Sequence, residues 1–124
     1  MEFQKDNTFV TGRLKSMKYA LMGAIKLITT EHSIMAQFSL GIVVTIAGFY
    51  FQITTTEWLF QTLAIGLVMS IEGLNTAVEK IADFIHPNYH ERIGFIKDIA
   101  AGAVFFAAMT AIAIGLIIYL PKFI

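Results

Sequence analysis

Three carboxylates and one asparagine lie at helical spacing within residues 72–83, inside a segment that is otherwise apolar. Counting from Glu72, steps of three, four, seven and eleven residues reach Asn75, Thr76, Glu79 and Asp83. At about 100° per residue, these five side chains share one stripe of an α-helix. An ionised carboxylate near hydrocarbon costs about 2.5–3.5 kcal/mol. This acidic stripe, formed by the five residues, is therefore a candidate active site.

The chemistry that these residue types favour is metal-assisted phosphoryl transfer. Oxygen ligands without cysteine suit Mg²⁺, which usually takes one or two protein carboxylates and completes its shell with water and phosphate. Glu79 and Glu31 are expected at the same depth near the inner membrane interface, where they could hold one or two metal ions on a nucleotide's phosphates. Glu72 lies about 10 Å deeper and could act as general base on a lipid hydroxyl. Lys97 could neutralise phosphate charge, while Asp98 could orient a ligand.

The apolar residues of this 124-residue chain are gathered in blocks. They make up 56% of the sequence, and the mean hydropathy is +0.69. Residues 34–51, 58–71 and 99–120 carry no charge. The last run is long enough to cross a hydrocarbon core of about 30 Å, and the first is just within range. The middle run spans only if it continues through the acidic stripe, which makes the stripe the cytoplasmic half of a transmembrane helix.

We predict an all-α membrane protein that forms a single integral membrane domain over residues 1–124. Between Phe9 and Thr29 the apolar positions recur at steps of three and four, which is typical of an amphipathic helix on the membrane surface. Pro87 ends the second span, because proline removes a backbone donor and disfavours helix before it. Small side chains in the last run let helices approach closely. The predicted elements are a surface helix at about 9–30 and spans at about 34–52, 58–84 and 98–120.

The placement of the basic residues predicts the topology. Of nine lysines and arginines, five precede the first span, three lie between or at the edge of the second and third, none lies in residues 52–57, and Lys122 ends the chain. By the positive-inside rule, the N-terminus and the 84–98 loop are cytoplasmic, and the C-terminus faces outward. Nine acidic residues balance the basic ones, so the charge gives no indication of a nucleic-acid partner. The absence of cysteine excludes disulfides and thiolate metal sites.

The acidic stripe also belongs to a longer motif. Glu72-x-x-Asn75-Thr76-Ala-Val-Glu79-x-x-x-Asp83 is followed by Pro87-x-Tyr89-His90 and by Lys97-Asp98-x-x-Ala-Gly-Ala-Val. Over residues from about 13 to 120, the chain resembles the small prokaryotic diacylglycerol kinase and undecaprenol kinase family of integral membrane lipid kinases. This resemblance implies a surface helix plus three transmembrane helices in the bacterial inner membrane, assembled as a homotrimer with active sites shared between subunits. The implied substrates are ATP and a membrane alcohol, either undecaprenol or diacylglycerol, with Mg²⁺ as cofactor.

The resemblance also implies roles for individual residues. Carried over by the motif, Glu72 is similar to the catalytic base that meets the lipid, and Glu79 and Glu31 are similar to the Mg²⁺ ligands. The other residues that contact the lipid are unknown. The residues that the resemblance places around the nucleotide are Tyr19, Asn75, Glu79, Asp83, Tyr89, His90, Lys97 and Asp98.

Three positions depart from the family pattern. Met35 stands where family members usually carry arginine, Gln37 replaces a frequent acidic or basic residue, and Arg13 aligns one position away from its equivalent. These departures concern the lipid-headgroup contacts and leave the chemistry of Glu72 and Glu79 intact. The Pro87-x-Tyr89-His90 segment and residues 101–104 look more like the undecaprenol kinase branch.

Other interpretations of the acidic stripe are an ion-coupled carrier and an accessory membrane subunit. A carrier predicts acids along a path through the whole bilayer, whereas the first and third spans hold none and the outer half of the second is read as apolar. Single residues also have structural alternatives. Asn75 could only join helices, and Asp83 could pair with Lys80 or Arg92 at the interface.

Overall fold

The computed structural model describes residues 8–124; residues 1–7, which include Lys5 of the basic N-terminal segment, lie outside the described part. The described chain is all-helical, as predicted. Its elements in chain order are α1 (Phe9–Thr30), α2 (His32–Tyr50), α3 (Thr55–Ile85), α4 (Glu91–Tyr119) and the short 3₁₀ turn η1 (Leu120–Lys122).

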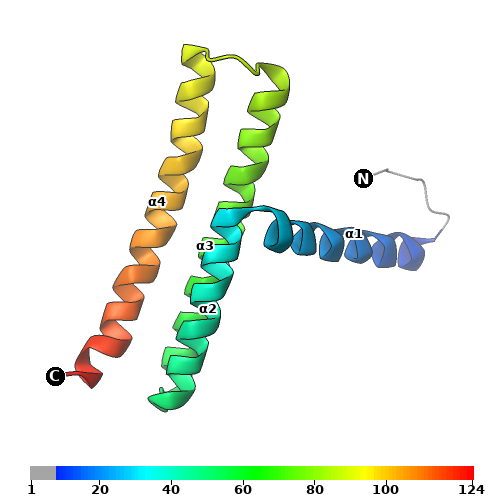
Figure 1. Ribbon diagram of the computed structural model, residues 1–124. Helices are drawn as coiled ribbons and strands as arrows, with labels where there is room; N and C mark the ends of the chain where they lie inside the picture. The colour runs from blue at the N-terminus through cyan, green and yellow to red at the C-terminus, as the bar shows by residue number, and fades with distance from the viewer. Residues whose placement is uncertain (1–7) are drawn as a thin grey trace.

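Helices α2, α3 and α4 run alongside one another, whereas α1 extends crosswise from them (Figure 1). The change of direction falls on Glu31, the one residue between α1 and α2, whose φ of −106° and ψ of 115° are extended. Within the described chain no residue of α1 is buried. The helix thus occupies the residues expected for the surface helix, and its location on a membrane stays a prediction.

Local capping explains where the helices begin. Thr54 and Glu57 form a capping box at the start of α3, in which each side chain bonds the other's backbone N–H. At the start of α4, the Nδ1 of His90 accepts a hydrogen bond of 3.0 Å from the backbone N–H of Arg92. This cap starts α4 at Glu91, well before the span expected from residue 98. Helix α3 ends at Ile85, two residues before Pro87, as the sequence predicts.

The packing of α2 on α3 follows a seven-residue repeat. The buried residues of α2 are Ile34, Gly41 and Gly48. A Cβ added to Gly41 would lie 3.2 Å from the side chain of Ile65, and one added to Gly48 would lie 2.6 Å from that of Trp58. One more repeat in this antiparallel register places Ile34 at the level of Glu72 on α3.

A second antiparallel register relates α3 to α4. Lys97 and Asp83 form an ion pair of 2.6 Å near the cytoplasmic end that we predict. Far from it, the hydroxyl of Tyr119 donates to Oε1 of Gln61. In two antiparallel helices, residues at the same level have numbers that add up to a constant, and both contacts give the same constant. By this rule, Glu72 lies at the level of Ala108. Ala107, next to it, is 4% exposed, and such small side chains let the two helices approach closely.

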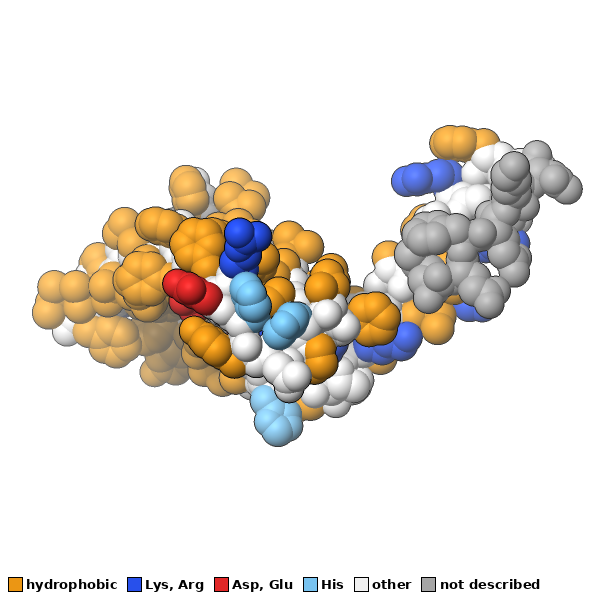
Figure 2. Space-filling model, turned by 90° about the horizontal axis from the view of Figure 1, so that it is seen from above, with side chains coloured by type: hydrophobic (Ala, Val, Ile, Leu, Met, Phe, Trp, Pro, Cys, Tyr) orange, Lys and Arg blue, Asp and Glu red, His pale blue; other side chains and the backbone are white. Residues whose placement is uncertain are grey.

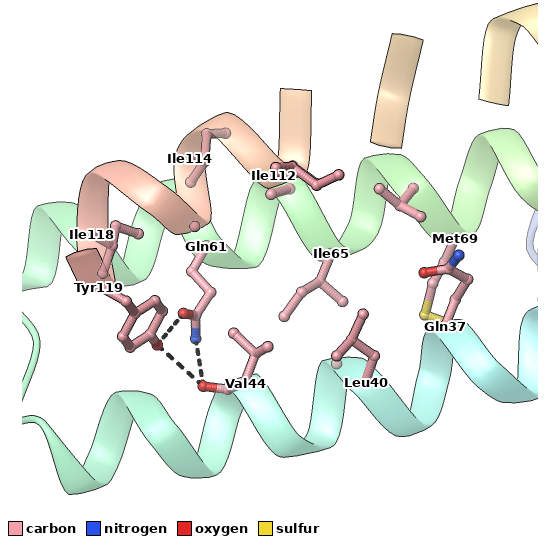
Figure 3. A pocket seen from close by; sticks show the side chains of 15 residues that line it. Gln37, Leu40, Val44, Gln61, Ile65, Met69, Ile112, Ile114, Ile118 and Tyr119 are labelled. Carbon is pink, nitrogen blue, oxygen red and sulfur yellow. Dashed lines mark hydrogen bonds between the residues drawn. The ribbon is translucent and has the colours of Figure 1, made fainter. Parts of the chain in front are cut away.

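A buried polar cluster joins all three long helices. Gln61 of α3 is 3% exposed, and its Nε2 donates to the carbonyl oxygen of Val44 in α2 over 3.3 Å. The hydroxyl of Tyr119, from α4, lies 3.2 Å from the same oxygen, so the three groups converge (Figure 3). They border an apolar cavity of about 220 Å³ between the helices. The prediction that the outer half of α3 is apolar is therefore wrong at Gln61.

Two helices of the described segment are long and apolar enough to cross a membrane, namely α2 and the stretch Glu91–Lys122. In the view from above, hydrophobic side chains also cover much of the visible surface of the bundle (Figure 2). Helix α3 has the length to span but carries the acidic stripe. The count of three spans therefore remains a prediction.

The contact between Gly48 and Trp58 leads to a prediction about stability. Replacing Gly48 with alanine should destabilise the bundle by about 1–3 kcal/mol, because the new Cβ would overlap the indole ring and force the helices apart. Unfolding of the purified protein in increasing sodium dodecyl sulfate would measure this. Gly23→Ala is the control, since nothing lies within 4 Å of its added Cβ. It should stabilise by up to about 1 kcal/mol. Equal effects of both changes would contradict the packing described.

Glu57, in the first turn of α3, predicts that the stability of the fold depends on pH. The hydrogen bond from the backbone N–H of Thr54 is the largest cause that holds the pKa of Glu57 below its ordinary value. Burial opposes it, and the ammonium of Lys122 lowers the pKa further. A lower pKa in the folded state means that the ionised carboxylate stabilises the fold above its ordinary pKa. That stabilisation is lost as the pH falls through the lowered value. Glu57→Gln should therefore unfold more easily than wild type at neutral pH.

The difference between Glu57→Gln and wild type should disappear under acid conditions, where both side chains are neutral. The measurement is the unfolding midpoint of each protein at the two pH values. The control is Glu91→Gln, which makes the same change in the first turn of α4. A difference for Glu57→Gln that stayed constant with pH would rule out the carboxylate as its source.

Candidate active site

Glu72 is the most buried charged side chain of the acidic stripe. It is 8% exposed, and its Oε2 is buried without a hydrogen-bond partner among the described residues. The two helix registers explain this, because Ile34 of α2 and Ala108 of α4 lie at its level and have no donors in their side chains. A carboxylate oxygen that is kept from water and from protein donors is ready to accept a hydrogen bond from a ligand.

Asn75 connects the buried part of the stripe to its exposed part. Its Nδ2 donates to Oε1 of Glu79 over 3.1 Å, and this fixes which way the amide faces. The Oδ1 of Asn75 is thereby left as a second buried acceptor without a partner in the described chain. Thr76, one turn from Glu72, donates to the Glu72 backbone carbonyl over 3.1 Å, so its hydroxyl is satisfied within the helix.

Two ion pairs bring outside residues to the exposed end of the stripe. The Oε1 of Glu31 lies 3.1 Å from Nζ of Lys80, which places Glu31 beside the turn of α3 that carries Glu79. The Nζ of Lys97 donates to Oδ1 of Asp83 over 2.6 Å. The alternative partners considered for Asp83, Lys80 and Arg92, were therefore wrong, because the register of α4 brings Lys97 to this position.

Other residues predicted around a nucleotide are not brought to the stripe within one chain. Tyr19 lies on α1, about 18 Å along the helix from Glu31, and α1 extends away from the bundle (Figure 1). Tyr89 is 87% exposed in the turn between α3 and α4, where its ring lies over Gly94. His90 caps α4. Asp98 is exposed on α4.

Sequence reasoning missed two features of the site. Leu27 of α1 contacts α3 beside Glu72, since a Cβ added to Gly73 would lie 3.2 Å from its Cδ1. Lys80 is the partner of Glu31, although the sequence suggested it only for Asp83. The apolar face of α1 could have indicated Leu27. Nothing in the spacing of residues 31 and 80 could have shown that they meet.

The end of the bundle with the α3–α4 turn gathers acidic, basic and histidine side chains within an apolar surround (Figure 2). The described residues contain no group of three or more potential metal-ligating side chains. Mg²⁺ does not need one, because it usually takes one or two carboxylates and keeps water and phosphate. Glu31 and Glu79 meet this requirement in donor chemistry, and Oε2 of Glu79 remains outside the bond to Asn75. The residues present therefore fit a nucleotide-bound Mg²⁺.

The chain is similar to known proteins over most of its length. The family profile described as prokaryotic diacylglycerol kinase matches residues 18–119. The undecaprenol kinase of Bacillus subtilis (strain 168) is 37% identical over 108 residues, which cover 87% of this chain and 88% of that protein. The diacylglycerol kinase of Haemophilus influenzae is 31% identical over 81% of this chain and 85% of its own. That of Synechocystis sp. is 33% identical over 87% of this chain and 62% of its own.

The chain belongs to the prokaryotic diacylglycerol kinase family. This confirms the resemblance inferred from the motif between Glu72 and Lys97-Asp98. It also confirms the expectation of an enzyme of the lipid kinase type, because the relatives carry that activity in their names. The interpretations as a carrier or accessory subunit find no support in these comparisons.

Proposed function

We propose that this protein is a Mg²⁺-dependent lipid kinase that transfers the γ-phosphoryl group of ATP to the hydroxyl of a membrane alcohol. The observation that carries the proposal is the buried Oε2 of Glu72, which has no hydrogen-bond partner in the described part of the chain. A carboxylate placed there is costly unless it has a task. Accepting the proton of a lipid hydroxyl is a task that requires a carboxylate at membrane depth.

The depth of the residues along α3 supports a reaction at the cytoplasmic interface. Trp58, near the start of α3, suits an outer interfacial position. At a rise of 1.5 Å per residue, Glu72 lies about 21 Å from the level of Trp58 and Glu79 about 32 Å. A hydrocarbon core is about 30 Å thick. Glu79 therefore falls at the inner boundary, within reach of a soluble nucleotide, while Glu72 is within the membrane.

The residues divide the reaction between them. Glu79 and Glu31 would hold the metal of MgATP, and Lys97 would neutralise phosphate charge. Bound Mg²⁺ supplies positive charge that stabilises the phosphoryl group as it moves. Glu72 takes the proton of the lipid hydroxyl while the oxygen of that hydroxyl forms the new bond to the γ-phosphorus. The bond from that phosphorus to the β,γ-bridging oxygen breaks, and ADP leaves. Asn75, which donates to Oε1 of Glu79, would orient that carboxylate.

Undecaprenol is the acceptor that we favour. The B. subtilis relative, whose name is undecaprenol kinase, is 37% identical over most of both chains, and the segment from Pro87 to His90 agrees with that branch. The apolar cavity also supports a long hydrocarbon substrate, because it runs from Gln61 and Tyr119 to Met69 and Gln37 (Figure 3). Its Met69 end is one turn of α3 from Glu72. Gln37, one of the departures from the family pattern, is thus placed to affect the lipid.

We further propose a multi-pass protein of the bacterial cytoplasmic membrane, with the N-terminus inside and the C-terminus outside. A homotrimer would complete the nucleotide site. In one chain α1 leads Tyr19 away from Glu79, so Tyr19 and the stripe can meet only if a second chain supplies one of them. The small side chains of α4 supply a surface suited to such helix packing.

A direct test is to incubate the purified full-length protein in mixed micelles with radiolabelled MgATP and either undecaprenol or diacylglycerol. We expect labelled lipid phosphate, with undecaprenol the better acceptor. Glu72→Gln should reduce turnover by about 10²–10⁴-fold, the usual contribution of a positioned general base. Glu57→Gln, the same change near the other end of α3, should stay active. Failure to label either lipid would exclude the proposed function.

The division of roles along the stripe can be tested separately. Glu79→Gln should weaken MgATP binding more than lipid binding, because it removes a metal ligand. Glu72→Gln should reduce turnover to the extent given above and leave nucleotide affinity largely unchanged. Calorimetric titration with a non-hydrolysable MgATP analogue measures the first effect, and single-turnover kinetics measures the second. The reverse pattern would overturn the assigned roles.

A further inference from the structure

The side chain of Glu31 pairs with a lysine of another helix and does not cap the helix that it precedes. Glu31 occupies the N-cap position of α2, where a carboxylate commonly accepts from the first backbone N–H groups. In the described structure it makes no such cap bond. Its Oε1 instead lies 3.1 Å from Nζ of Lys80 on α3, with the Glu31 side chain 23% exposed and that of Lys80 69% exposed. Glu31 is therefore held toward the acidic stripe by a lysine.

This pairing occupies a carboxylate that the proposed reaction requires for metal. A lysine ammonium against Oε1 of Glu31 disfavours a divalent cation at the same carboxylate, because their charges repel. The second ion pair, Lys97 with Asp83, lies on the same turn of α3. In the nucleotide-free chain, the carboxylates of Glu31 and Asp83 near Glu79 are therefore already neutralised by lysines.

We propose that Lys80 is a resting counter-ion of Glu31 that competes with the divalent metal and so makes metal binding depend on nucleotide. This inference rests on the proposed function, whose metal ligands include Glu31. When MgATP arrives, its phosphates offer Lys80 a more negative partner, and Glu31 becomes available to the metal. Lys80 is thus a positioning residue. It keeps Glu31 at the site while the site is empty, and it disfavours metal without nucleotide.

The test is a titration of the nucleotide-free, full-length protein in detergent micelles with Mn²⁺, followed by electron paramagnetic resonance. Lys80→Gln should bind Mn²⁺ about two- to fivefold more tightly than wild type, the range that a partly exposed ion pair can supply. Lys80→Arg, which keeps the charge, should behave as wild type. Lys26→Gln removes one exposed positive charge from α1 and controls for a general effect of charge.

A double variant identifies the carboxylate involved. Adding Glu31→Gln to Lys80→Gln should remove the gain in Mn²⁺ affinity, because the competing site is lost. The proposal is overturned if Lys80→Gln binds Mn²⁺ no more tightly than wild type, or if no protein in the series binds it. It is also overturned if Lys26→Gln gives the same gain, or if the gain survives Glu31→Gln. Circular dichroism of each variant confirms that it is folded.

The Mn²⁺ titration and the lipid assay distinguish failure of the role of Lys80 from failure of the kinase proposal. A chain that labels no lipid but shows the Lys80-dependent gain in Mn²⁺ affinity would contradict the kinase proposal alone. A chain that phosphorylates lipid without that gain would contradict the role of Lys80 alone. In an active chain, Lys80→Gln should also reduce the extent to which nucleotide strengthens Mn²⁺ binding, by the same factor by which it raises affinity without nucleotide.

Discussion

A carboxylate buried in the middle of a helical bundle constrains everything around it. Glu72 faces inward, yet the layer of the bundle around it contains Ile34 and Ala108, and its Oε2 has no hydrogen-bond partner among the described residues. A protein selected for stability alone would fill this layer with apolar side chains. Retaining the acid makes sense only if a donor arrives from outside the chain. The stripe around it supplies the route, since Asn75 and Glu79 extend from this layer toward the end of the bundle that we predict to be cytoplasmic.

The two packing registers determine what the carboxylate meets. Against α2, the seven-residue repeat that ends in Gly41 and Gly48 brings backbones close at the outer half and puts Ile34 beside the acid. Against α4, polar contacts at both ends, Lys97 with Asp83 and Tyr119 with Gln61, prevent slippage of the helices. Interhelical hydrogen bonds in membranes contribute on average about 0.6 kcal/mol each. Their value here is in fixing the register more than in adding stability.

Much of this could be predicted from the sequence, because helix ends and helical faces are local properties. The helix over residues 9–30 and the break at Pro87 follow from periodicity and proline chemistry, and the stripe follows from spacing alone. The ion pairs could not be predicted, because they depend on registers between distant segments. Lys80 is separated from Glu31 by almost two complete helices, and the partner of Asp83 depends on how α4 packs. Gln61 was overlooked because an uncharged side chain hardly changes the hydropathy of a span.

The relation of α1 to the stripe follows from a single residue. Glu31 alone separates α1 from α2, so its extended backbone sets the direction of the whole of α1. The same residue contributes its carboxylate to the site, and Leu27, one turn earlier, rests against Gly73 beside Glu72. A movement of α1 would therefore affect both ends of the stripe, through Leu27 near Glu72 and through Glu31 near Glu79. Because α1 also lies where a membrane surface is expected, the position of that surface and the geometry of the site become linked through one turn of backbone.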